Sequence, residues 1–360
     1  MAAVGSAAKN DAVPVISPNR KTAIVLFNLG GPDKPEAVQP FLFNLFNDPA
    51  IIGLPQVARQ PLASFISRRR EKTARAIYEE IGGKSPILEN TEAQAKALEA
   101  SLSGHGELKV FVAMRYWHPF AEQVVRDVAA YAPNHIILLP LYPQFSTTTT
   151  GSFFTEWERV AKAAKLEIPT SNICCYPTHP EFIKAHAALI RTYYEEAKHF
   201  GAPRILFSAH GLPEKTVKRG DPYQAQIEAT SQAIVEELGI ANLDYANCYQ
   251  SRVGPLKWIG PSTSDELLRA GYEKKPVVLV PIAFVSEHSE TLVELDIEYA
   301  ELAHGNGVDR YYRVPTLSTE AYFIAALSDI CLKTTTAITI APAEGVPRCA
   351  ANFCQCACVT

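Results

Sequence analysis

Hydrophobic residues gather in short, nearly continuous runs that alternate with longer segments of helical periodicity. Eight runs are predicted as strands: Thr22–Leu29, Val110–Met114, His135–Leu141, Ile173–Tyr176, Arg204–Ser208, Leu243–Asn247, Val277–Phe284 and Arg310–Val314. Candidate helices between them include Thr91–Leu102, Glu181–Ala197 and Asp221–Leu238. Apolar strands that alternate with helices are typical of parallel sheets covered on both faces, so the pattern predicts an α/β fold.

The strands divide evenly about Gly201-Ala202-Pro203, which predicts two α/β halves hinged at this point. We expect an N-terminal domain over residues 21–200 and a C-terminal domain over 201–333. Residues 1–20 read as a flexible arm, and residues 334–360 as a linker with a cysteine-rich tail. The arm has no apolar core of a secretory signal, although a transit peptide stays open.

The segment Pro40–Ile66 interrupts the alternation with a dense set of apolar residues, and Arg68-Arg69-Arg70 follows it. One interpretation is a pair of helices packed on the core, with the arginines in solvent. The other is an apolar lip for a flat, greasy ligand or a membrane surface, with the basic residues near lipid phosphates.

Composition and charge exclude several classes of protein. The 360 residues are 47% hydrophobic and 20% charged, which supports a large core and argues against general disorder. The net charge of −4 lacks the basic field of a nucleic-acid-binding protein. The longest apolar run, Val277–Val285, is far shorter than the roughly 20 residues of a membrane-spanning helix.

Candidate chemistry lies where the predicted strands end, because ligands of open α/β sheets bind beyond the carboxyl ends of the strands. His210 follows Arg204–Ser208 and precedes a Gly-Leu-Pro turn. Arg115 and Tyr116 follow the second strand in the same way. An imidazole at this position can bind a divalent metal or accept a proton near neutral pH.

An acidic stripe is predicted after the strand at Val277–Phe284. In a helix that begins near Ser289, the residues Glu290, Glu294 and Glu298 share one face. Like charges at this spacing disfavour a helix, and no Lys or Arg lies nearby in sequence to compensate them. The stripe reads either as a solvated face or as a path for cations or protons.

The chain resembles the ferrochelatases, which insert ferrous iron into a porphyrin to make haem. The matching segments run in the family's order from Lys21 to Leu332: LFNLGGP (Leu26–Pro32), IGGKSPI (Ile81–Ile87), MRYWHP (Met114–Pro119), LYPQFSTTTTGS (Leu141–Ser152), FSAHGLP (Phe207–Pro213), YQSRVGPLKWIGP (Tyr249–Pro261) and PIAFVSEHSETLVELDIEY (Pro281–Tyr299). The resemblance implies two Rossmann-like domains of chelatase type. Each would hold a four-stranded parallel sheet flanked by helices, with porphyrin between them.

The resemblance also assigns roles to residues. It places the iron site on His210 and Glu290, because these match the family's SAH and ETL motifs. Glu294 would continue the acidic row, and Glu287 and His288 would line the same cleft as further catalytic residues. The expected porphyrin-binding residues are Arg115, Tyr116 and Trp258.

Metallation removes both pyrrole N–H protons while a dication enters, which suits a histidine beside carboxylates. Whether His210 acts as base or as metal ligand stays open at this point. So does the choice between protoporphyrin IX, which we expect, and coproporphyrin. The alternatives are a tetrapyrrole- or metal-binding protein of the same fold, and a cobalt chelatase acting on another tetrapyrrole. We expect a cytoplasmic protein with peripheral contact at the inner membrane; a homodimer is one option.

Four of the eight cysteines fall in the last twelve residues, and clustered cysteines in a cytosolic protein suggest metal rather than disulfides. Some ferrochelatases carry a [2Fe–2S] cluster on such an extension, held by three tail cysteines and one from the body of the chain. That resemblance implies a cluster on Cys349, Cys354 and Cys356 with Cys175. Cys174 or Cys358 could replace one of these, and a zinc site or a redox-labile tail are the alternatives.

Overall fold

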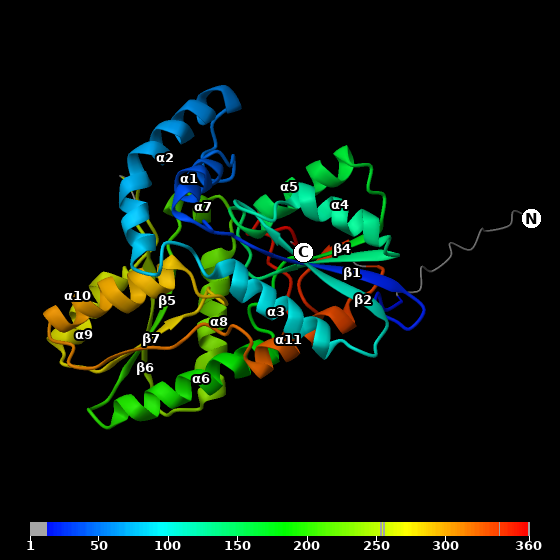
Figure 1. Cartoon of the computed structure of the whole chain (residues 1–360). Coiled ribbons are helices and arrows are strands. Elements are labelled where there is room, and N and C mark those ends of the chain that lie inside the picture. Colours follow the sequence, from blue (N-terminus) through cyan, green and yellow to red (C-terminus); the bar gives the residue numbers. More distant parts are fainter. Residues whose placement is uncertain (1–12, 253, 255, 338, 359–360) are drawn as a thin grey trace, which may run out of the picture.

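The computed structural model describes residues 13–358 except 253, 255 and 338, so most of the expected N-terminal arm lies outside the described residues. The fold is α/β, with two parallel sheets flanked by helices (Figure 1). The strands are β1 (Lys21–Asn28), β2 (Glu107–Met114), β3 (His135–Pro140), β4 (Thr170–Ile173), β5 (Arg204–His210), β6 (Asp244–Gln250), β7 (Val277–Pro281), β8 (Tyr311–Arg313) and β9 (Ile340–Ala341).

Helices connect the strands and cover both faces of each sheet (Figure 1). They are η1 (Pro35–Ala37), α1 (Val38–Phe46), α2 (Gln56–Glu79), α3 (Ile87–Ser101), α4 (Ala121–Tyr131), α5 (Thr150–Ala163), α6 (Pro180–Lys198), α7 (Glu214–Lys218), α8 (Tyr223–Leu238), α9 (Thr263–Tyr272), η2 (Glu290–Glu298), α10 (Tyr299–Gly305) and α11 (Ala321–Lys333). Among them η2 is a π-helix, whose turns are wider than those of an α-helix.

Both sheets share one strand order over four strands. The first runs β2-β1-β3-β4-β9 and the second β6-β5-β7-β8, with every pairing parallel. The first strand of each half therefore lies between the second and third, and the order reverses beside it. In open α/β sheets, ligands bind where the strand order reverses. The carboxyl ends of the central strands, β1 and β5, therefore mark a candidate site in each half.

All eight predicted strands are present, and two differences have clear causes. The fourth begins and ends three residues earlier than Ile173–Tyr176. The N–H of Tyr176 donates to the carbonyl of Pro143 (2.8 Å), so the end of this apolar run is buried outside the sheet. The short strand β9 (Ile340–Ala341) was not predicted; it pairs with β4, so the first sheet has five strands rather than four.

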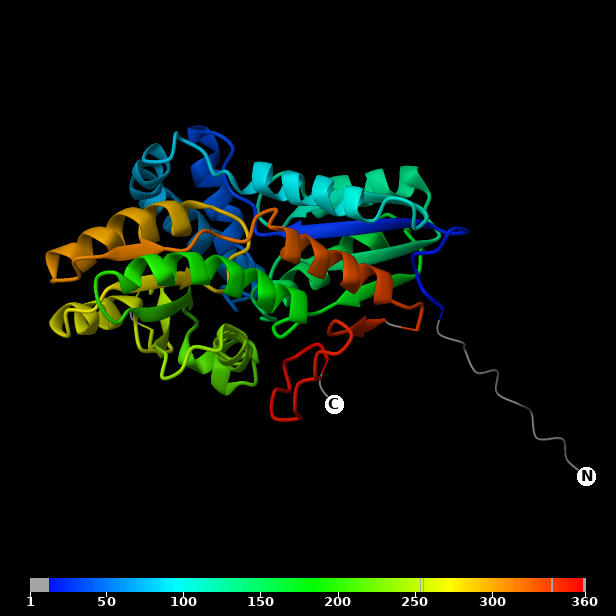
Figure 2. The same ribbon diagram turned by 90° about the horizontal axis from the view of Figure 1, so that it is seen from below.

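One apolar core runs through both halves. Its largest cluster joins Ile24 and Leu139 of the first sheet with Ile205 and Val280 of the second, all fully buried. Helix α11 comes from the end of the chain and packs on α3 and α6 of the first half. Figure 2 shows α11 and α6 side by side beneath the sheets. The predicted hinge near Gly201 therefore lies between halves that share their packing.

Helices α1 and α2 form the predicted lip at one side of the molecule (Figure 1). Val38, Phe41 and Leu42 are buried against Tyr78 and Tyr116. The exposed apolar residues of this region are instead Ile51, Leu54, Val57 and Phe65. The lip thus has a packed inner face, as in the first interpretation, and an exposed apolar outer face, as in the second.

Candidate active site

The carboxyl ends of the strands in both sheets meet in one region, which we call the junction. At the end of β1, the side-chain amide of Asn28 donates to the hydroxyl of Ser286, which follows β7 (3.3 Å). After β3, the amide of Gln144 donates to the hydroxyl of Thr230 on α8 (3.0 Å). Side chains that follow strands in one half therefore contact those of the other half.

His210 and Glu290 form the central pair of the junction. His210 is the last residue of β5, and Glu290 is the first residue of η2. The Nδ1 atom of His210 lies 2.9 Å from Oε2 of Glu290. The side chains are 37% and 30% exposed, so solutes can reach both. Since Nδ1 faces the carboxylate, Nε2 is the ring nitrogen that Glu290 leaves available.

The electrostatics of this pair favour an ionised carboxylate beside a basic imidazole. Burial lowers the pKa of His210, but the charge of Glu290 and the hydrogen bond between them outweigh it, so the pKa lies above its ordinary value. For Glu290, burial raises the pKa, but the charge and hydrogen bond of His210 hold it well below the usual range. His210 is thus a stronger base than a free histidine.

Glu294 lies beside the pair and is held by a different strand. Its carboxylate accepts hydrogen bonds from the backbone N–H of Ser251 (2.9 Å) and the amide of Gln250 (3.0 Å), at the end of β6. Burial, and then the charge of Glu290, raise the pKa of Glu294 above its ordinary value. The predicted acidic row therefore holds for Glu290 and Glu294, whereas Glu298 is exposed to solvent.

The two other residues expected at the site differ in their contacts. His288 is buried; its Nδ1 lies 3.1 Å from the carbonyl of Ser286 and its Nε2 3.9 Å from Oε2 of Glu290, so it borders the central pair. The carboxylate of Glu287 instead accepts from Arg313 (2.6 Å). Burial raises the pKa of Glu287, but the charge of Arg313 outweighs it and lowers the net value. The structure thus places Glu287 in an ion pair that anchors the loop.

Arg115 and Tyr116 both contact a residue that the sequence analysis did not single out. The carboxylate of Asp48 accepts from the guanidinium of Arg115 (3.0 Å) and from the hydroxyl of Tyr116 (2.7 Å). Tyr116 is only 1% exposed, so its side chain supports the site from within. A sequence signal did exist, because Asp48 is the only charged residue between Glu36 and Arg59.

Trp258 lies against the turn that follows His210. A Cβ atom placed on Gly211 would come within 3.2 Å of the Trp258 ring, so the turn and the indole are in close contact. The indole Nε1 is buried and has no hydrogen-bond partner among the residues that the structure describes. This arrangement is compatible with the expected role of Trp258 beside a bound ring system.

A buried amide that sequence reasoning missed connects α3 to the loop carrying His288. The Nε2 of Gln94 donates to the carbonyl of Val285 (2.7 Å), and its Oε1 accepts from the hydroxyl of Ser286 (2.9 Å). Gln94 is 0% exposed. A glutamine inside a helix gives no sequence signal for such a contact, which spans the two halves of the chain.

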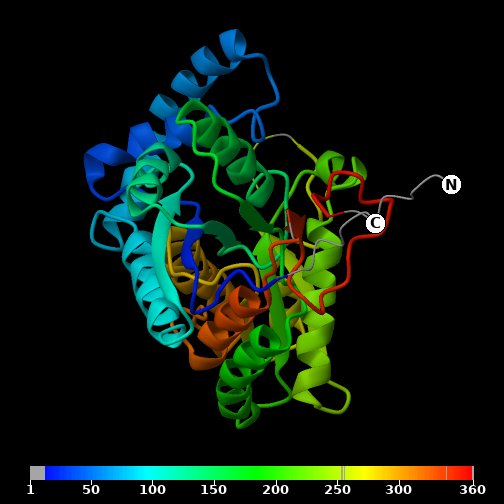
Figure 3. The same ribbon diagram turned by 90° about the vertical axis from the view of Figure 1, so that its right-hand side faces the viewer.

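Five cysteines gather below the junction, where the C-terminal tail passes between β4 and α8 (Figures 2 and 3). The Sγ atom of Cys358 lies 2.6 Å from that of Cys174, which lies 3.5 Å from Cys175. The side-chain amide of Gln226, on α8, contacts the sulfurs of Cys175 (3.6 Å) and Cys349 (3.3 Å).

Cys356 completes this cysteine group. Hydrogen bonds from the thiols of Cys174 and Cys349 lower the pKa of Cys356 to about 3, although burial acts in the opposite direction. The group therefore favours a thiolate at its centre, which is the form that binds metals. Within the described part of the chain, no three His, Cys, Asp or Glu side chains converge as ligands of a single metal ion.

Cys354, one of the cluster ligands expected from the sequence, lies outside the cysteine group. Its thiol is exposed and donates to the carbonyl of Arg219 (3.3 Å). Gly220, in the loop between α7 and α8, lets the tail pack closely here, because a Cβ atom on it would lie 2.7 Å from the Cys354 sulfur. The loop thus directs Cys354 toward α7 while its neighbours face β4.

The fold defines the structural class of the protein. A solved structure of similar fold is SirB from Bacillus subtilis with Fe3+, which matches with a TM-score of 0.51 and 13% identity. The match covers 86% of this chain and 93% of SirB. At this identity the likeness concerns the fold alone, and it places the chain in the chelatase fold class.

The sequence comparisons then identify the family. The family profile of ferrochelatase matches residues 21–335. A ferrochelatase of Pelagibacter ubique is 55% identical, over 87% of this chain and 91% of the relative. One of Caulobacter vibrioides is 53% identical, over 94% of this chain and 98% of the relative. The chain belongs to the ferrochelatase family.

Proposed function

We propose that the junction performs the reaction of the ferrochelatase family, the insertion of ferrous iron into a porphyrin to form haem. The contact that carries this proposal is the 2.9 Å approach of His210 Nδ1 to Glu290 Oε2. It sets a metal-ligating and proton-accepting pair at the carboxyl end of a central strand, where ligands of such sheets bind. Family membership supports the same reaction.

In the proposed mechanism, His210 acts mainly as the proton acceptor. Glu290 holds the proton on Nδ1, so the lone pair of Nε2 is free to accept a pyrrole proton. The imidazolium that results is stabilised by the Glu290 carboxylate, which agrees with the raised pKa of His210. When iron is present before the transfer, the same nitrogen and carboxylate are suitable ligands for it.

Glu294 provides a route for protons away from the porphyrin. Its raised pKa brings it nearer to neutral pH, so it can accept a proton that His210 releases and pass it on. The hydrogen bonds from Ser251 and Gln250 hold its carboxylate in place during this exchange. Arg115 and Trp258 would contact the macrocycle, with Tyr116 supporting Arg115 from behind.

The porphyrin we propose is protoporphyrin IX. The exposed apolar face of the lip is a better neighbour for it than for coproporphyrin, which carries more propionate groups. The purified chain should convert protoporphyrin IX and ferrous iron to haem over many turnovers, under anaerobic conditions. A parallel assay with coproporphyrin compares kcat/KM. Binding of protoporphyrin without turnover would instead identify a tetrapyrrole-binding protein, and a higher kcat/KM for coproporphyrin would contradict the choice of substrate.

We also propose a [2Fe–2S] cluster on the cysteine group, held by Cys349, Cys356 and Cys358 of the tail with Cys174 of the body. Thiolates are the ligands such clusters require. Hydrogen bonds from Cys174 and Cys349 lower the pKa of Cys356, whereas hydrogen bonds within the group raise the pKa values of Cys174 and Cys349. Each iron of a [2Fe–2S] cluster needs only two protein ligands, whereas a zinc ion requires four donors around itself. The bound cluster would supply a one-electron redox centre.

The ligand set predicts a difference between neighbouring cysteines. Cys356→Ser and Cys358→Ser should lose the visible absorption, iron and acid-labile sulfide of anaerobically purified protein, because each removes a ligand. Cys354→Ser is the matched control and should retain all three, since its thiol points to Arg219. A colourless parent protein with bound zinc would exclude the cluster, and loss of colour in Cys354→Ser would restore the original set.

Membrane contact through α2 is a further part of the proposal. Val57 and Phe65 are 85% and 61% exposed on one face of this helix. Pro61 lies between them, and Arg68 and Arg69 follow on the next turn. An apolar face followed by arginines suits the interface of an anionic membrane. No helix in the described ranges is long and apolar enough to span a bilayer.

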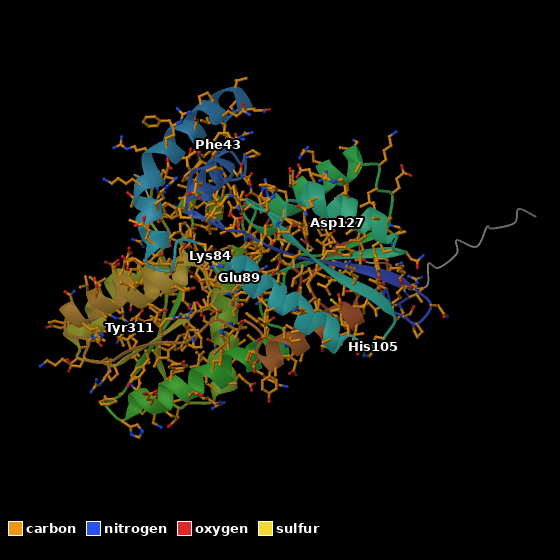
Figure 4. All side chains as sticks on the ribbon, viewed as in Figure 1. Phe43, Lys84, Glu89, His105, Asp127 and Tyr311 are labelled. Carbon is orange, nitrogen blue, oxygen red and sulfur yellow. The ribbon has the colours of Figure 1, made fainter. Side chains whose placement is uncertain are left out.

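Vesicle flotation tests this surface. Val57→Glu with Phe65→Glu should release the protein from vesicles of phosphatidylglycerol and phosphatidylcholine, because the change removes the exposed apolar face. Tyr272→Glu, at a residue that is 90% exposed on α9, is the matched control and should not affect binding. Phe41 is unsuitable for this test because it is buried. Phe43 belongs to the same helix and lies on the same side of the molecule as α2 (Figure 4). Equal flotation of both variants would contradict the proposal.

A further inference from the structure

Asp48 is a buried carboxylate at the base of the lip, just after α1. It is 3% exposed, and both of its oxygens are used. Oδ2 accepts from the guanidinium of Arg115 (3.0 Å), the hydroxyl of Tyr116 (2.7 Å) and the hydroxyl of Ser152. Oδ1 accepts from the backbone N–H of Ala50 (2.8 Å). These four donors replace the water that the carboxylate loses on burial.

These contacts fix the orientation of Arg115. One nitrogen of its guanidinium bonds to Asp48, and its Nε donates to the hydroxyl of Ser152 on α5 (2.7 Å). The guanidinium also lies over the ring of Tyr116, with 4.9 Å between its carbon and the ring centroid. A planar guanidinium held at two nitrogens and one face has little freedom to turn.

Arg115 and the iron site act on the same region of the junction. Tyr116, whose ring lies under the Arg115 guanidinium, packs with Tyr78, and the Tyr78 hydroxyl accepts from the hydroxyl of Ser289 (3.5 Å), the residue before Glu290. The charges of Arg115 and Glu290 also both act on the pKa of the buried Tyr142 hydroxyl, although burial dominates it. A ferrous ion that approaches Glu290 therefore also meets the positive field of Arg115. Without a counter-charge, that field would repel the ion.

We propose that Asp48 is a positioning residue for iron insertion, which orients Arg115 and balances its charge on the path of the metal. This inference rests on the proposed function of the junction. Asp48 touches neither substrate, so its effect passes through Arg115. Asp48 also holds the lip in place relative to the site, because its backbone carbonyl accepts from the N–H groups of Ile51 (3.1 Å) and Ile52 (2.9 Å).

The charge is tested by Asp48→Asn, which keeps the shape and the acceptor for Ala50. We expect the KM for ferrous iron to rise about tenfold, as for a lost charged hydrogen bond. The Kd for protoporphyrin, measured by fluorescence quenching, should rise by less than the KM for iron, because the guanidinium that contacts the macrocycle keeps its hydrogen bond to Ser152 and its stacking on Tyr116. Added salt should partly restore kcat/KM for iron, because it screens the unbalanced guanidinium. Asp48→Glu, which retains the charge, should recover most of the loss.

A second substitution separates this role from a general loss of structure. In Asp48→Asn with Arg115→Leu, the KM for iron should return toward that of the parent, while kcat stays low because Arg115 is missing. A purely structural role predicts that the second change makes both constants worse. The matched control is Asp244→Asn, which breaks a similar pair with Arg204 (2.9 Å) at the opposite end of the second sheet. It should lower stability and leave iron kinetics unchanged.

The outcomes distinguish this inference from the proposed function. If the parent inserts no iron, the function itself is wrong. If the parent inserts iron and Asp48→Asn does so with an unchanged KM for iron, only the role of Asp48 is overturned. If thermal unfolding shows that Asp48→Asn is not folded, the single variant Arg115→Leu tests the inference instead. It leaves Asp48 as an unbalanced anion, so its KM for iron must fall below the parent value; an unchanged or higher KM overturns the inference.

Discussion

Iron insertion by His210→Ala is expected to be at least about 100-fold slower than in the parent, the scale of losing a general base. The substitution removes the Nε2 lone pair that accepts the pyrrole proton and leaves Glu290 without its partner. Haem formation under anaerobic conditions, with both substrates saturating, measures the effect on kcat. The fold should persist, because the imidazole is 37% exposed and supports no buried core.

The control for this substitution is another histidine of the same chain. His105 is exposed on the loop between α3 and β2 and lies far from the junction in Figure 4. His105→Ala should retain full activity. Near-parental turnover by His210→Ala would show that another group accepts the proton, and His288, whose Nε2 lies 3.9 Å from Glu290, would be the next candidate.

Glu290→Gln is expected to reduce kcat about 100-fold, since the imidazolium loses its stabilising charge. It should also change the pH dependence. In the parent, Glu290 raises the pKa of His210, so Nε2 is free of its proton only at higher pH. Without that charge the pKa falls, and the acidic limb of the kcat/KM profile should move to lower pH. Initial rates across a pH series measure both effects.

Glu298→Gln is the matched control, because Glu298 carries the same charge at the exposed end of η2. Its kcat should remain within about twofold of the parent, as for most surface substitutions. Glu294→Gln should fall between the two variants, because Glu294 passes on protons that His210 has already accepted. A larger loss in Glu298→Gln than in Glu290→Gln would reverse the proposed path, and an unshifted acidic limb would separate His210 from Glu290.

The layout of the site follows from the sequence as far as strand ends determine it. Parallel strands place their carboxyl ends at one edge, so a histidine that ends Arg204–His210 must face the loop after Val277–Pro281. That reasoning singled out His210, Glu290 and Glu294 as candidates, and the resemblance to the ferrochelatases supplied their expected roles. The period of a helix also placed Glu290 and Glu294 together, even though the segment is a π-helix rather than an α-helix.

Contacts between distant segments could not be predicted in the same way. Asp48 and Arg115 are joined only once α1 packs against the loop after β2, where Asn44 donates to the carbonyl of Tyr116. Gln94 reaches Ser286 only because α3 contacts both halves. In the tail, cysteine spacing alone does not tell which way each thiol points, and Cys354 makes its contacts with the distant residues Arg219 and Gly220. These contacts depend on tertiary packing, whereas the apolar runs that predict strands are local features of the sequence.

The lip shows a further limit of pattern reading. Where almost every residue is apolar, as in Phe41–Phe46, the sequence does not distinguish the packed face of a helix from the outer one. The structure buries Phe41 and exposes Val57, which lies in a more polar stretch. Hydrophobicity singled out the segment, but which of its residues are exposed depends on how α1 and α2 pack together.

The return of α11 and β9 to the first half has a consequence for synthesis of the chain. Helices α3 and α6 leave the ribosome long before α11, which packs on them. Likewise, β4 leaves it long before β9, the strand with which it pairs. Until residues 321–341 have been made, the nascent first half presents an apolar helical surface and an unpaired strand edge. It therefore cannot complete its fold until residues 321–341 have left the ribosome.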